Sequence, residues 1–127
     1  MALPDKGQAN AQAAYAAAKA GTFMMPEDSA KRLAASCDKL AAGLQDEIRS
    51  SQFLTLVTGF PDLPSGHGLT QGFTAKGHEY IETLTSFQEV ALRYKAAFLA
   101  AGKQFTEADA ATRQAIKVAT EKLEDNK

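Results

Sequence analysis

Several residue types that specialised sites need are scarce or missing in this chain of 127 residues. It has no tryptophan, two histidines and a single cysteine, Cys37. One cysteine excludes an intramolecular disulfide framework and every cysteine-rich zinc motif. An excess of charge of one sign is missing too, because 14 Lys and Arg face 15 Asp and Glu. We therefore expect no nucleic-acid partner, since general nucleic-acid binders usually carry a basic excess or stripe.

Long apolar runs are also missing. No stretch approaches the about 20 apolar residues that a bilayer crossing requires, so we expect no membrane span. The amino terminus does not read as a signal peptide, because Lys6 is the only basic residue before a weakly apolar, alanine-rich stretch at 11–18. We therefore expect a protein that is cytoplasmic or that is secreted by a signal-peptide-independent route.

The residues that are present have the composition of a folded domain. Hydrophobic residues make up 45% of the chain and charged residues 23%, which is typical of a globular protein. The length favours one domain with a modest core. Alanine supplies much of the apolar fraction, and each alanine buries little area, so we expect stability to depend on a few Leu, Phe and Tyr residues.

The first long helix is predicted over about 26–58. Pro26 suits the first helical position, and the acidic residues 27 and 28 suit the positive end of the helix dipole. An apolar stripe follows at steps of three and four residues, formed by Leu33, Cys37, Leu40, Leu44 and Ile48. Two prolines and four glycines in 59–72 then predict a loop, with a turn at Ser65, Gly66, His67 and Gly68.

The strongest pattern begins at Phe73, after which there is no proline. Apolar and small residues alternate at steps of four and three, the signature of a heptad seam. They are Phe73, Gly77, Tyr80, Leu84, Phe87, Ala91, Tyr94, Phe98, Ala101, Phe105 and Ala108. Gly102 offers a helix end, and Thr106 with Asp109 offers a weak capping box that restarts a helix. Because the seam runs through this point, we favour one helix over about 73–119.

These segments predict an all-α fold. Helices of similar length, roughly 50 and 54 Å, form a long antiparallel hairpin over 25–127, preceded over 1–24 by an alanine-rich arm or short helix. The apolar width exceeds what one neighbouring helix covers, so we expect two hairpins to pair into a four-helix bundle. The alanine-rich arm covering this face within the chain is the competing solution. The predicted partner interface consists of Leu33, Leu40, Leu44, Ile48, Tyr80, Leu84, Phe87, Tyr94 and Phe98.

No catalytic or metal-binding constellation stands out. Ser65 and His67 lie close in sequence but lack the nucleophile elbow, so a glycine-rich turn with an exposed histidine is the simpler interpretation. His78 and Glu82 lie one helical turn apart, whereas a di-iron bundle needs ligand motifs from several helices. Cys37 lies in the apolar stripe, where a buried, inert thiol is expected. We therefore predict a protein that is not an enzyme and that holds no metal or cofactor.

Two long helices, a glycine-containing loop, no signal peptide and an aromatic–acidic motif near the carboxyl end resemble the small ESX-type (WXG-like) proteins of type VII secretion systems. The resemblance covers roughly 25–119. The family's export motif is Tyr-Xaa-Xaa-Xaa-Asp/Glu, and here Phe105-Thr-Glu-Ala-Asp109 has Phe in place of Tyr. The family's turn carries Trp-Xaa-Gly, of which the loop at 65–68 keeps only the glycine.

The resemblance implies a secreted substrate or a helical binding partner in type VII secretion. Its partner would be a second copy or an ESX-like protein in a heterodimer, and Phe105 and Asp109 would be displayed to the export machinery, for example a type VII secretion ATPase. The alternative is a cytosolic helical adaptor or immunity-type binding protein that is not exported. It would use the same apolar face, and detection in the culture supernatant separates the two hypotheses.

Overall fold

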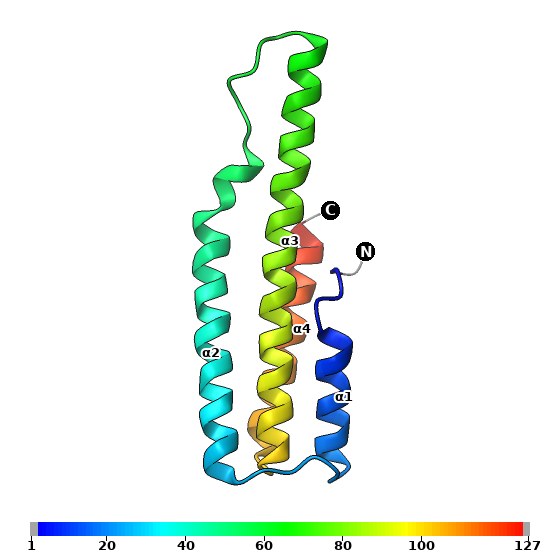
Figure 1. Ribbon diagram of the computed structural model, residues 1–127, viewed down its shortest axis with the longest axis vertical. Coiled ribbons are helices and arrows are strands. Elements are labelled where there is room, and N and C mark those ends of the chain that lie inside the picture. The colour runs from blue at the N-terminus through cyan, green and yellow to red at the C-terminus, as the bar shows by residue number, and fades with distance from the viewer. Residues whose placement is uncertain (1–2, 126–127) are drawn as a thin grey trace.

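A computed structural model describes residues 3–125, with side chains described as far as residue 122 (Figure 1). The elements are α1 (Gln8–Lys19), α2 (Glu27–Ser50), the short 3-10 helix η1 (Gln52–Thr55), α3 (Pro64–Ala101) and α4 (Phe105–Asp125). The described residues contain no strand. The predicted all-α class is therefore confirmed.

Helix α3 is the centre of the molecule. Helices α1, α2 and α4 each pack against α3, and η1 packs against it near its amino-terminal end. Figure 1 shows α2 and α1 on either side of α3, with α4 behind it and the amino-terminal end of α3 extending beyond the others. The segment predicted as an arm or a short helix contains α1. Three helices thus pack around α3, whereas the predicted hairpin gave this helix one neighbour.

The contacts around α3 are made mainly by alanine. Among the residues whose side chains the structure describes, the large members of the buried apolar set are Ile48, Ile81, Leu84, Leu92 and Leu99. The other buried apolar residues are Ala11, Ala18, Ala30, Ala34, Ala41, Ala91, Ala96, Ala97, Ala100, Ala101, Ala108, Ala111 and Ala115. No described Phe or Tyr is buried, so the expectation that aromatic residues anchor the core is wrong. Methyl-sized side chains let helix axes approach closely, which leaves no room for rings between them.

Helix α1 is fastened to α3 by a buried polar contact as well as by alanines. Glu89 is only 6% exposed, and its carboxylate accepts a hydrogen bond from Nε of Arg93 at 2.7 Å. Nε2 of Gln8 donates a second hydrogen bond to Oε1 of Glu89 at 3.2 Å. A buried carboxylate needs such partners, because leaving it unpaired would be strongly destabilising.

The connection between α2 and α3 differs from the prediction. Helix α2 ends at Ser50 and not near residue 58, because side chains after Ile48 take over its terminal carbonyls. Nε2 of Gln52, for example, donates to the carbonyl of Ile48 at 3.1 Å. Helix α3 then begins at Pro64, which occupies its first turn. The predicted loop is therefore wrong over 64–72.

The residues predicted as a turn, Ser65, Gly66, His67 and Gly68, lie in the first turns of α3. Glycine is required in α3 where another backbone segment approaches the helix closely. A Cβ atom at Gly66 would overlap the carbonyl oxygen of Pro61. Further along α3, a Cβ atom at Gly77 would overlap the carbonyl oxygen of Leu54. These two glycines let the backbone of 51–63 lie directly against α3.

The predicted helix over 73–119 is broken at 102–104. Lys103 adopts a left-handed conformation with φ 64°. Its N–H donates to the carbonyl of Ala100 at 3.0 Å, and the N–H of Gln104 donates to that of Leu99 at 2.8 Å, which is the Schellman pattern of a helix end. Helix α4 then folds back so that Ala108 and Ala111 join a core cluster with α3. The heptad pattern therefore continues along the sequence although the chain reverses its direction between α3 and α4.

This turn predicts opposite effects of two neighbouring substitutions. A Cβ atom at Gly102 would overlap the methyl group of Ala30, so Gly102→Ala is expected to lower the free energy of unfolding by about 1–3 kcal/mol. Lys103→Gly relieves the left-handed strain and is expected to raise it by about 0.5–1 kcal/mol. Urea titration followed by circular dichroism measures both. Equal effects of the two substitutions would contradict this description of the turn.

Candidate protein-binding groove

One side of α3 is left open between α2 and α1. A groove of about 600 Å³ lies there and is lined by Cys37, Leu40, Leu44, Phe87, Val90, Ala91, Tyr94 and Phe98. The ring of Phe23, from the α1–α2 connection, packs edge-on against Phe98 at a centroid distance of 6.5 Å and closes the base of the groove. Gly7, before α1, lies beside Val90. The groove thus has α3 as its floor and α2 along one side, and the residue that precedes α1 lies beside Val90 on the other side.

Large apolar side chains in this region are exposed although alanines are buried. Leu40 is 56% exposed and Phe87 is 42% exposed. Helix α2 carries two apolar faces: Ala30, Ala34, Ala41 and Ile48 are buried against α3, whereas the stripe of Leu33, Cys37, Leu40 and Leu44 borders the open side. A contiguous exposed apolar surface of this kind is typical of an interaction site.

The groove contains most of the residues predicted for the partner interface. Leu40, Leu44, Phe87, Tyr94 and Phe98 line it. Leu33 is 40% exposed one turn further along the stripe. Ile48 and Leu84 were predicted in the same interface, but they are buried against Ile81 in a small core cluster. That part of the prediction is wrong, because these two residues lie where α2 and α3 face each other.

A second apolar cleft lies at the amino-terminal end of α3 and was not predicted. It measures about 560 Å³ and is lined by Phe53, Leu54, Leu56, Val57, Thr58, Phe60, Phe73, Lys76, Gly77 and Tyr80. Phe53 is 68% exposed and Leu56 is 78% exposed. Its sequence signal is the run of apolar residues within 53–57, which falls inside the helix predicted over about 26–58. We call this surface the tip cleft.

The tip cleft and the groove follow one line along α3. Phe73 and Tyr80 line the tip cleft, Phe87 and Tyr94 line the groove, and these four residues are spaced seven apart. Residues at this spacing share a helix face. At the junction, the hydroxyl of Tyr80 donates to Oε1 of Glu47 at 3.0 Å. This hydrogen bond raises the pKa of the Tyr80 hydroxyl. We call the combined surface the apolar strip.

Cys37 is a half-buried thiol in the wall of the groove. Burial, and to a smaller extent the neighbouring Asp38, raise the pKa of this thiol, while Lys95 acts in the opposite direction. Lys95 itself forms an ion pair with Asp38 at 2.8 Å. A raised thiol pKa is the opposite of what a nucleophilic cysteine needs. Because Cys37 lines the groove, the accessibility of its thiol to an alkylating reagent reports whether the groove is covered.

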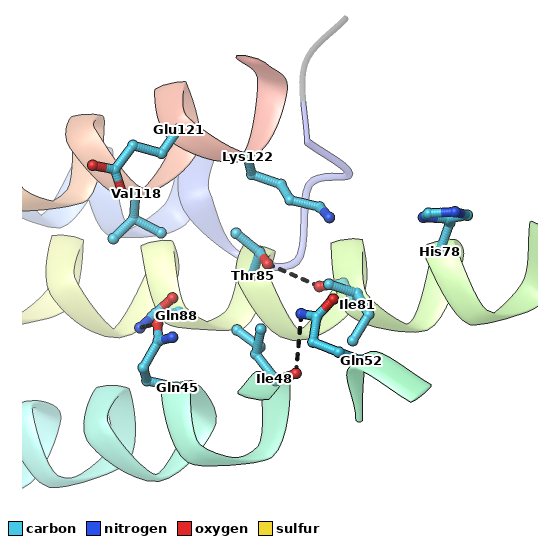
Figure 2. A pocket seen from close by; sticks show the side chains of 10 residues that line it. All are labelled: Gln45, Ile48, Gln52, His78, Ile81, Thr85, Gln88, Val118, Glu121 and Lys122. Atoms are coloured by element: carbon cyan, nitrogen blue, oxygen red, sulfur yellow. Dashed lines mark hydrogen bonds between the residues drawn. The ribbon is translucent and has the colours of Figure 1, made fainter. Parts of the chain in front are cut away.

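A polar pocket lies on the α4 side of α3, near the carboxyl end of α4. It measures about 370 Å³ and is lined by Gln45, Ile48, Gln52, His78, Ile81, Thr85, Gln88, Val118, Glu121 and Lys122. Figure 2 shows His78 at one end of this pocket and Lys122 reaching across it. Several polar groups are already paired, such as Nε2 of Gln88, which donates to Oε1 of Gln45 at 3.0 Å. Within 3–125, the structure brings together no group of three His, Cys, Asp or Glu residues suited to a metal ion.

The structure brings the two residues of the predicted export motif together. Phe105 opens α4, and Asp109 follows one turn later. Asp109 accepts a hydrogen bond from the hydroxyl of Tyr15 at 2.9 Å and lies 3.9 Å from Nζ of Lys19. Lys19 also lies 5.5 Å from the centre of the Phe105 ring. Phe105 is 42% exposed, so the pair is partly covered by α1 and partly accessible.

Comparison with protein-family models, with curated proteins and with solved structures finds no match to this chain. No helix within residues 3–125 has the length and apolar character that crossing a bilayer requires. The resemblance to ESX-type proteins therefore remains a prediction from the motif and the helical pattern.

The inverted placement of large and small side chains predicts the effects of two adjacent substitutions in α2. Leu40 is 56% exposed and Ala41 is 7% exposed. In the isolated chain, Leu40→Ala is expected to change the free energy of unfolding by less than about 1 kcal/mol, well below the usual loss for a buried leucine. Ala41→Leu is expected to lower it by about 1–3 kcal/mol through overpacking against α3. Chemical denaturation in dilute solution distinguishes them, and the reverse order would refute the proposed open face.

Proposed function

We propose that this protein binds a helical partner chain through its apolar groove and takes part in type VII secretion as a substrate or as a binding partner. The observation that supports partner binding most directly is the exposure of Leu40 and Phe87 beside a core built from alanine. A chain with this many small residues in its core would ordinarily bury its few large apolar side chains. Their position at the surface is explained if a second chain buries them.

The shape and chemistry of the groove favour a helix as the occupant. The groove runs along α3, and its lining side chains are apolar apart from the Cys37 thiol and the Tyr94 hydroxyl. The spacing of Phe87 and Tyr94 matches the heptad repeat with which helices interlock. An amphipathic helix presenting anchors every three or four residues would fill such a groove. Both a homodimer and a heterodimer satisfy this requirement.

The pair Phe105 and Asp109 supports the secretion part of the proposal. The two side chains lie on one face of the first turn of α4, and about half of the Asp109 side chain is exposed. An aromatic ring beside a carboxylate is the chemistry that the family's export motif displays. A cytosolic adaptor or immunity-type protein would use the groove in the same way but would not need this pair.

The binding proposal is tested by Phe87→Asp with Ile116→Asp as a matched control. Ile116 is 49% exposed and lies on α4, away from the groove-lining residues. Molar mass in solution is measured for each variant alone, and together with the product of an adjacent open reading frame. Phe87→Asp is expected to abolish association through the groove, whereas Ile116→Asp is expected to retain it. Association that survives Phe87→Asp would contradict the assignment of the groove.

The secretion proposal is tested by Phe105→Ala and Asp109→Ala, with Tyr15→Phe as the control. Tyr15→Phe removes the hydrogen bond to Asp109 without altering the motif, so it separates loosening of α1 from loss of a signal. Both motif variants are expected to keep their helical content and to disappear from the culture supernatant. Export that is unchanged by both would overturn the pair as an export signal, and a wild-type protein that stays out of the culture supernatant would leave the cytosolic adaptor as the function.

A further inference from the structure

The apolar strip has two halves of different shape. In the groove half, α3 lies between α2 and the start of α1, so the surface is recessed. In the tip half, α3 extends beyond α1 and α4, and among the described residues it is flanked mainly by η1 and the 51–63 segment (Figure 1). This projecting half carries Leu69 at 47%, Phe73 at 55% and Tyr80 at 40% exposure. One molecule therefore carries an apolar groove between two helices and an apolar end of α3 that α1 and α4 do not reach.

We propose that the groove is occupied by a second copy of this chain, with the tip half of each α3 lying antiparallel in the groove of the other copy. This inference rests on the proposed function and names its partner. A twofold axis would make the exchange reciprocal, so each copy buries the apolar end of its α3 and has its groove filled. A parallel pairing would instead set groove against groove, where the α1 and α2 walls of both copies would keep the two α3 helices apart.

The spacing of the aromatic residues selects one register for this pairing. Phe73, Tyr80, Phe87 and Tyr94 repeat every seven residues, and an axis between Thr83 and Leu84 places Phe73 opposite Tyr94 and Tyr80 opposite Phe87. This alignment pairs the apolar strip over residues 69–98, about 44 Å of helix at 1.5 Å per residue. Every aromatic residue of the row then faces another ring, and such ring pairs stabilise an interface beyond the effect of the apolar area that they bury.

The neighbouring registers fit less well. Moving the axis to Tyr80 places Tyr94 opposite Gly66, which offers no side chain. Moving the axis to Phe87 brings Phe73 to Ala101, where the α1–α2 connection already covers α3, because the N–H of Met25 donates to the carbonyl of Ala101 at 3.1 Å. The ends of the groove thus limit the alignment to the middle register.

The exposed apolar area is sufficient for a stable dimer. Ten large apolar residues that border the strip and the tip are about half exposed on average: Leu33, Leu40, Phe53, Leu56, Phe60, Leu63, Leu69, Phe73, Tyr80 and Phe87. At about 200 Å² per large side chain, they offer roughly 1,000 Å² per copy, against about 800 Å² per partner in a standard interface. A net charge of −1 produces little repulsion between two copies.

The register is tested by disulfide trapping in a Cys37→Ala background. Thr83 lies between Tyr80 and Phe87 on the strip, next to the predicted axis, so Thr83→Cys is expected to form a disulfide-linked dimer under mild oxidation. Lys76 holds the equivalent place between Phe73 and Tyr80, far from its own copy across that axis, so Lys76→Cys is the matched control and is expected to remain monomeric on a non-reducing gel. Trapping of Lys76→Cys would overturn the antiparallel arrangement.

The unmodified protein supplies the second measurement. Because the α3 of the second copy would cover Cys37 in the dimer, the rate of alkylation of Cys37 by iodoacetamide is expected to fall several-fold as protein concentration rises, while molar mass doubles from 13.5 kDa. Phe87→Asp is expected to keep the fast rate and the monomer mass at every concentration. A wild-type chain that stays at 13.5 kDa with a constant alkylation rate would overturn the second copy as occupant. If Phe87→Asp then also fails to weaken binding of another helical chain, the proposed function is overturned with it.

Discussion

The alanine contacts around α3 determine where every large side chain of this protein lies. Helix α2 meets α3 through Ala34 and Ala41, and α4 meets it through Ala111 and Ala115. Contacts between methyl groups draw helix axes together, so aromatic rings are excluded from the spaces between helices and move to the edge of α3. Each alanine buries little area, which leaves a long molecule with a thin core. Burial of the apolar strip by a partner would add what this core lacks.

Helix α1 connects the two surfaces to which we assign function. A helix of 12 residues is marginal by itself, and this one depends on polar contacts at both ends. Gln8 binds the buried Glu89 near the groove, while Tyr15 and Lys19 contact Asp109 at the start of α4. The same helix therefore borders the groove and partly covers the Phe105–Asp109 pair. Any partner that moves α1 would change the exposure of that pair.

The sequence was sufficient for the helical class and for most of the groove. Leu40, Leu44, Phe87 and Tyr94 follow helical periods strong enough to be recognised without a structure. Periodicity gives large residues more weight than alanine, however, and so it identified the Leu-rich face of α2 while the alanine face packs against α3. Helix α2 has two apolar faces, and the face with the smaller residues is the one that is buried. Which face is buried depends on tertiary packing and not on the sequence of the helix alone.

Two other features could not be predicted, because local signals point away from them. The helix end at 102–104 places lysine in the left-handed position where glycine is usual, and the heptad seam continues across it. The glycines at 66 and 77 read as loop or weak helix positions, yet each sits where the 51–63 backbone touches α3. Both features depend on contacts between segments distant in sequence, which a pattern along the chain does not contain.

The cavities of this protein favour recognition of a chain over binding of a small molecule. A small-molecule site usually encloses its ligand and combines apolar walls with a few converging polar groups. The polar pocket beside α4 has amide and charged groups but pairs several of them internally. The groove and the tip cleft have apolar walls and follow one face of α3, which gives them length instead of enclosure. Length along a helix, with side chains at heptad spacing, is a property that another helix can match.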